Sequence, residues 1–166
     1  MLQYASVGFL LAAAWRDLAT RTIPDWLSLG LAALGLALRA PSGLMALAAS
    51  VTMAAFLFLL LVLLHARGGL GGGDVKLITA MALGLPPLVT LDFLLATALA
   101  GGVLGLLYLA LGRLAPNPAA LAGTAASLPR RVLAVEHRRI HRRGPLPYAV
   151  AIAVGGIVIL LEPMGG

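Results

Sequence analysis

Apolar residues form six runs along the chain, separated by short polar segments. The runs cover about 2–15, 24–38, 43–64, 74–85, 88–112 and 146–161. A helix needs about 20 apolar residues to cross a bilayer core of about 30 Å, and the runs 43–64 and 88–112 reach that length alone. The pattern therefore predicts an all-α membrane protein with six transmembrane helices.

The composition supports one membrane domain. Of the 166 residues, 61% are hydrophobic and 11% are charged, whereas a soluble domain has roughly 25% charged residues. The only sizeable polar segment is 113–145, so we expect a single polytopic domain over 1–166 with this segment as a loop. The chain has no cysteine, which excludes disulfides and thiolate–metal sites.

The basic residues predict the orientation. The run 74–85 would extend only about 18 Å as a helix, so a re-entrant half-helix is the alternative to a crossing. If all six runs cross, the loops 16–23, 65–73 and 113–145 share one face with eleven of the twelve Lys and Arg residues, and only Arg39 lies opposite. By the positive-inside rule that face is cytoplasmic and both termini are on the non-cytoplasmic side.

The arrangement of the positive charge also bears on partners. We expect no nucleic-acid partner, because the net charge of +6 follows the membrane topology. The basic end of 113–145 contacts anionic membrane lipids as an amphipathic helix, or it is a solvated charge run that only sets topology. His137 and His141 lie four residues apart there, but arginines flank them and a third ligand is missing, so we predict no metal site.

Three carboxylates lie at cytoplasmic ends of apolar runs, where ionisable groups often mark function. Asp17 follows the first run, Asp25 begins the second and Asp74 begins the fourth. Two carboxylates brought close together share a proton, so that one deprotonates water while the other protonates a leaving group. The alternatives are a helix N-cap for Asp74 and a juxtamembrane charge near Arg16 or Arg21 for Asp17.

The stretch "GGLGGGDVKL" at 68–77 places glycines directly before Asp74. Glycines adopt torsions closed to other residues and let a second chain approach closely, which suits a protease that holds its substrate extended. A flexible hinge is the alternative. A phosphate-binding loop is excluded, because the pattern G-x-x-x-x-G-K-[ST] is absent.

These motifs resemble a known family. Gly71-Gly72-Gly73-Asp74 matches the G-x-G-D motif of intramembrane aspartic proteases, and "GGGDVKL" looks like the type IV prepilin peptidases. The stretch "RDLATRTIPDWLSL" at 16–29 resembles the first half of their signature, and "GPLPYAVAIAVGG" at 144–156 resembles the start of their last helix.

The resemblance implies a catalytic pair, Asp17 and Asp74, with Gly71 and Gly73 shaping the active-site loop and Lys76 within the motif. Asp25 is the second candidate for the first catalytic acid, although it looks like a turn or cap residue. No metal or organic cofactor is implied. By resemblance, the protein removes the short basic leader of type IV prepilin-like precursors at the cytoplasmic face of the bacterial inner membrane.

Other readings remain open. The large family members add a cysteine-containing domain and N-methylate the processed pilin; without cysteines this chain is closer to the small branch that serves Flp (tight-adherence) pili, and we expect no methyltransferase activity. A proton-coupled transporter with Asp17 and Asp74 as proton sites and a non-catalytic assembly scaffold are the rival functions. For Tyr148 we favour a place at the membrane interface over one in an active-site wall.

Overall fold

A computed structural model describes residues 1–114 and 146–162, with side chains described to residue 110 of the first range. No strand occurs in these ranges, and the elements are α1 (Leu2–Thr20), α2 (Asp25–Arg39), the 3₁₀ turn η1 (Ala40–Ser42), α3 (Leu44–Ala66), α4 (Gly72–Leu83), α5 (Pro87–Leu114) and α7 (Tyr148–Leu161). The predicted all-α fold is confirmed, with a helix at each apolar run. The expected basic amphipathic segment and the His137–His141 pair lie outside the described residues.

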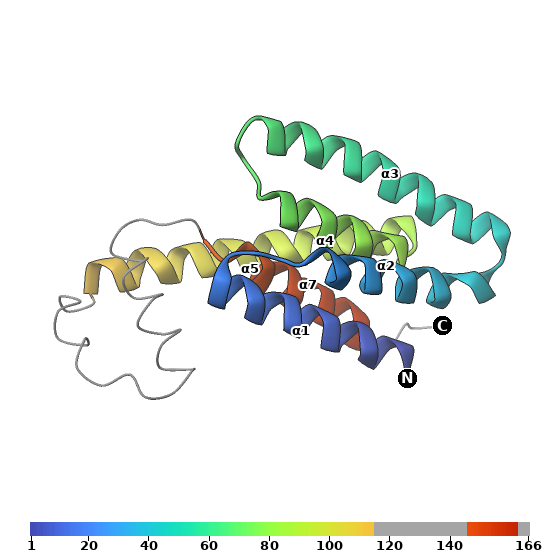
Figure 1. Ribbon diagram of the computed structural model, residues 1–166, viewed down its shortest axis with the longest axis horizontal. Helices are drawn as coiled ribbons and strands as arrows, with labels where there is room; N and C mark the ends of the chain where they lie inside the picture. Colours follow the sequence, from blue (N-terminus) through green and yellow to red (C-terminus); the bar gives the residue numbers. More distant parts are fainter. Residues whose placement is uncertain (115–145, 163–166) are drawn as a thin grey trace.

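Successive helices run in opposite directions along one axis (Figure 1). The connections 21–24 and 67–71 and the start of α7 therefore lie at the same end of the bundle. We call this the carboxylate end, because Asp17, Asp25 and Asp74 all lie there. Helix α1 continues to Thr20, beyond the predicted run 2–15, so Asp17 lies within the last turn of a helix and not after it.

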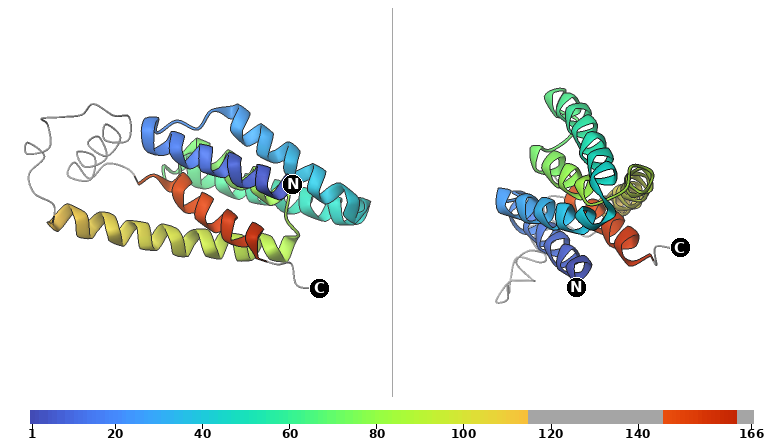
Figure 2. Two further views of the ribbon diagram at one scale, coloured as in Figure 1. Left: turned by 90° about the horizontal axis from the view of Figure 1, so that it is seen from below. Right: turned by 90° about the vertical axis from the view of Figure 1, so that its right-hand side faces the viewer.

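The short helix α4 is the centre of the fold. It contacts α2, α3 and α7, while α7 also packs against α1 and α5. Half of its 12 residues are buried, and they include Leu77, Ile78 and Met81 in the main apolar core. The end-on view in Figure 2 shows α3 at one edge of the bundle, beside α4. The residues next to Asp74 on α4 are thus held on several sides.

Two polar features fix the opposite end of α4. The fully buried Ser50 donates a hydrogen bond of 2.8 Å to the Leu85 carbonyl and accepts one of 3.0 Å from Arg39 Nε. Because Pro86 and Pro87 interrupt the helix, the Leu85 carbonyl needs such a partner. Nearby, α2 and α4 touch through glycine: a Cβ on Gly35 would lie 2.8 Å from the Gly84 backbone nitrogen.

The outer surface is apolar. Leu44–Ala66 and Pro87–Ala110 are long and apolar enough to cross a membrane, with mean hydropathies of 2.7 and 2.1. Phe56, Leu59, Leu99 and Leu106 on these helices are each more than half exposed. Apolar surface on this scale is rare on soluble monomers, so the two helices fit a membrane protein.

Candidate active site

One cavity of about 960 Å³ lies at the carboxylate end, and both Asp17 and Asp74 line it. Its walls come from α1, the segment 21–24, the glycine loop 68–71, and the nearby parts of α3, α4, α5 and α7. Carboxylates that are far apart in the sequence therefore line the same cavity. They also interact electrostatically with each other.

Asp17 is held by the last described helix. Its side chain is 8% exposed, and its Oδ2 accepts a hydrogen bond of 3.2 Å from the Ala149 backbone N–H. Ala149 lies in the first turn of α7, where N–H groups have no partner within the helix and the helix dipole favours negative charge. The α7 N-terminus therefore stabilises an ionised Asp17 inside the bundle, which is not the setting of an exposed juxtamembrane charge.

Asp74 is the third residue of α4, and Gly71 occupies the N-cap position. The alternative that Asp74 is itself the N-cap is therefore wrong. Instead, its carboxylate accepts a hydrogen bond from the Gly71 backbone N–H, as the third helical residue does in a capping box. This bond fixes the direction of the carboxylate, and Asp74 still lines the cavity and interacts with the charge of Arg21.

Two of the three glycines before Asp74, Gly71 and Gly73, lie close to other side chains. Gly71 has φ −71° and ψ 142°, which any residue adopts, and Gly72 and Gly73 are helical, so the expectation of special torsions at these three positions is wrong. A Cβ on Gly71 would lie 2.8 Å from Asp74 Oδ2, and one on Gly73 would lie 3.1 Å from Ile23. These two glycines therefore leave room for Asp74 and Ile23, and the predicted approach of a second chain stays a prediction.

Asp25 and Lys76 form an ion pair of 2.7 Å across α2 and α4. The Asp25 side chain is 69% exposed and does not line the cavity, whereas Lys76, 50% exposed, does. Asp25 is the first residue of α2 after Pro24 and lies in its first turn. The structure thus brings Asp17, Asp74, Gly71, Gly73 and Lys76 around one space and leaves Asp25 outside it.

Comparison with known proteins assigns the chain to a family. A model of the type IV leader peptidase family matches residues 4–106, more than half of the sequence. The chain belongs to the type IV leader peptidase family. No curated protein and no solved structure matches. The matched range contains all three candidate acids and Lys76 but ends before α7, so the Ala149 contact to Asp17 lies outside it.

Membership in the leader peptidase family implies peptidase activity and prepilin-like substrates. The cavity that Asp17 and Asp74 line has three further residues that the sequence analysis did not assign to an active site. Arg21 caps α1 in a left-handed conformation with φ 57°, Tyr148 begins α7, and Thr97 on α5 is 2% exposed. All three line the cavity, so Tyr148 belongs to its wall and not only to the membrane interface as we had favoured.

Thr97 is notable because its buried hydroxyl has no hydrogen-bond partner among the described residues. It lies against Gly155 of α7, where a Cβ would come within 2.4 Å of Thr97 Oγ1. The only sequence signal was a hydroxyl residue within the apolar run 88–112. A helical wheel cannot tell which neighbour such a residue faces, because that depends on how α5 and α7 pack.

Proposed function

We propose that this family member is a membrane-embedded aspartic endopeptidase that removes the short basic leader from type IV prepilin-like precursors. The observation that carries the proposal is the shared cavity, which Asp17 of α1 and Asp74 of α4 both line together with a strip of glycine backbone. Each carboxylate accepts a hydrogen bond from a backbone N–H, Asp17 from Ala149 and Asp74 from Gly71.

The chemistry follows from a shared proton. Two interacting carboxylates titrate as a pair, with one ionised and one protonated form near neutrality. The ionised carboxylate takes a proton from water as the oxygen attacks the scissile carbonyl carbon. The protonated one then gives its proton to the leaving nitrogen as the C–N bond breaks. The first carboxylate carries the proton from water at the end, so the pair keeps one proton overall.

The glycine loop suits an extended substrate. Gly68, Gly69, Gly71, Gly72 and Gly73 all line the cavity, and without side chains their backbone lets another chain approach closely. A leader junction lying along this strip would reach both carboxylates. The substrate's apolar helix would then continue into the membrane beside the bundle.

For the topology we propose one domain with six crossings. The alternating directions of the helices support this, since they leave both described ends of the chain opposite the carboxylate end (Figure 1). The basic residues then place the carboxylate end and the loop 113–145 on the cytoplasmic side of a bacterial inner membrane, where the loop meets anionic lipids. We propose that the protein has no N-methyltransferase activity and that its reaction uses no cofactor.

The function is tested with purified protein in detergent and a pilin-like precursor that carries a basic leader and an apolar helix. We expect a single cut at the leader junction, identified by the masses of the two products. A precursor whose leader is already removed should stay intact. If several precursors bind but remain whole, the protein is a scaffold; if reconstituted vesicles show Asp17-dependent proton flux without cleavage, it is a transporter. Either result would reject the peptidase.

A further inference from the structure

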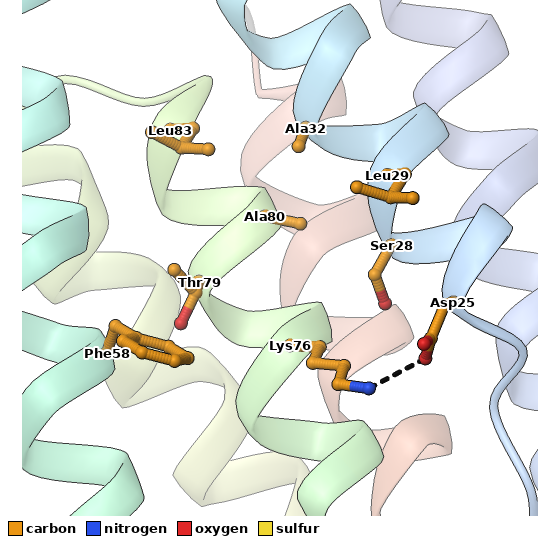
Figure 3. A pocket seen from close by; sticks show the side chains of 9 residues that line it. All are labelled: Asp25, Ser28, Leu29, Ala32, Phe58, Lys76, Thr79, Ala80 and Leu83. Carbon is orange, nitrogen blue, oxygen red and sulfur yellow. Dashed lines mark hydrogen bonds and ion pairs between the residues drawn. The ribbon is translucent and has the colours of Figure 1, made fainter.

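A second hollow lies between α2 and α4, with Phe58 of α3 at its edge (Figure 3). Its volume is about 270 Å³, and its lining is almost entirely apolar. We call it the side groove. Lys76 borders both the side groove and the cavity that contains Asp17 and Asp74, but neither of these acids lines the side groove.

The polarity of the residues that line the side groove changes along α2 and α4. The Asp25–Lys76 ion pair lies at one end, Ser28 lies one turn further along, and Leu29, Ala32 and Leu83 follow (Figure 3). With a rise of about 1.5 Å per residue, Ser28 is about 4.5 Å deeper than Asp25 and Ala32 about 10 Å deeper. The order from the carboxylate end inwards is therefore charge, hydroxyl, hydrocarbon.

Ser28 is the second, independent sign of a ligand. Its side chain is 7% exposed, and its hydroxyl has no hydrogen-bond partner among the described residues. A buried hydroxyl without a partner is costly. The other hydroxyl in the groove, that of Thr79, is satisfied by the Val75 carbonyl at 2.8 Å, so Ser28 is the groove hydroxyl without a partner among the described residues.

The ion pair has unused bonding capacity. Lys76 has three N–H donors and Asp25 has about four acceptor sites, and the pair is joined by one contact of 2.7 Å while both side chains stay half exposed or more. The mouth of the groove thus offers one positive and one negative group side by side. A ligand that carries both charges complements it better than a ligand with one.

The volume of the side groove favours a narrow chain over a helix as the occupant of its interior. A helix about 10 Å across that followed the groove for two turns would displace about 800 Å³. The side groove provides about 270 Å³. An extended hydrocarbon chain fits within this space, whereas the apolar helix of a precursor could only lie across its opening.

We propose that the side groove binds a phospholipid whose headgroup carries a primary ammonium, of the phosphatidylethanolamine type. Its phosphate lies at Lys76, its ammonium donates to Asp25, an ester oxygen accepts from Ser28, and one acyl chain follows Leu29 and Ala32 inwards. The site is independent of the peptidase reaction. Through Lys76, however, the bound lipid forms part of the border of the active-site cavity.

The test measures lipid binding without any precursor. Delipidated protein is titrated with phosphatidylethanolamine, phosphatidylglycerol or phosphatidylcholine of identical acyl chains, and the complexes are counted by native mass spectrometry. We expect phosphatidylethanolamine to bind at least about 3-fold more tightly than either other lipid, in keeping with exposed charge pairs. Asp25→Asn should remove most of its advantage over phosphatidylglycerol.

Two variants address the groove itself. Ala32→Phe fills the space for the acyl chain and should weaken phosphatidylethanolamine binding at least about 10-fold, since a packed site resists an added ring. Ser28→Ala should weaken it by about 2- to 12-fold, the factor for one net hydrogen bond. Ala33→Phe is the matched control, because Ala33 is exposed on the same helix outside the groove and should bind as wild type does.

Equal binding of the three lipids would overturn the proposal, as it would show only general solvation of an apolar surface. Unchanged phosphatidylethanolamine binding in both Ala32→Phe and Ser28→Ala would overturn the site even if the preference exists. Ser28→Ala keeps the shape of the helix, so it decides the matter if Ala32→Phe fails to fold. A precursor that displaces the bound lipid would assign the groove to substrate instead.

Discussion

Replacing Asp74 by Asn is expected to lower the rate of precursor cleavage by at least about 10²- to 10⁴-fold, the range for loss of a general acid or base. The amide cannot exchange the proton that the reaction needs. It still offers an oxygen to the Gly71 N–H, which the Asp74 carboxylate accepts in the wild type. The fold should therefore survive, and single-turnover cleavage with thermal unfolding in the same detergent checks both statements.

The double variant Asp17→Asn/Asp74→Asn provides the control for a shared role. Groups that act as one unit lose their effect together, so the double variant should cleave no more slowly than the slower single variant. If the two losses multiply, the carboxylates act independently. Loss of a general acid or base typically lowers the rate by at least about 100-fold. If Asp74→Asn keeps more than about a tenth of the wild-type rate, Asp74 therefore has no role in proton transfer.

Gly35→Ala is expected to destabilise the fold by about 1–3 kcal/mol, the usual cost of overpacking, although alanine favours helix over glycine by about 1 kcal/mol. The added Cβ would lie 2.8 Å from the Gly84 nitrogen and 2.9 Å from its Cα. These are backbone atoms that no rotamer change can move, so α2 and α4 must separate. Thermal unfolding in detergent measures the effect.

Gly102→Ala is the matched control for Gly35→Ala. Gly102 is also inside a helix, and a Cβ there meets nothing within 4 Å. Its stability should equal or slightly exceed that of the wild type. Equal melting temperatures for the two variants would show that the α2–α4 contact is not as tight as the structure has it.

The sequence was sufficient to predict the helices and to single out the two acids that line one cavity. The length of an apolar run identifies a membrane helix. The G-x-G-D motif identifies Asp74, because a helix that begins directly after glycines is a local feature of the sequence. The sequence placed the end of the first span at Asp17, because Arg16 and Asp17 end the apolar run, whereas α1 continues to Thr20. The helix ends where Arg21 takes a left-handed conformation and donates its backbone N–H to the Asp17 carbonyl.

What the sequence could not give is pairing across the bundle. Lys76 pairs with Asp25 and Ala149 holds Asp17, and each contact joins residues whose spacing along the chain carries no signal. The same is true of Thr97 and Tyr148 in the cavity wall. Such contacts depend on how α2, α4, α5 and α7 pack, which is a property of the whole fold.

The central claim is that Asp17 and Asp74, not Asp25, form the catalytic pair. The most direct measurement compares cleavage of one precursor by the wild type and by Asp17→Asn, Asp74→Asn and Asp25→Asn at equal amounts of folded protein. We predict that Asp25→Asn cleaves at close to the wild-type rate, because Asp25 lies outside the cavity in an exposed ion pair, while the other two lose cleavage. Loss in Asp25→Asn with retention in Asp17→Asn would contradict the account and make Asp25 the first acid.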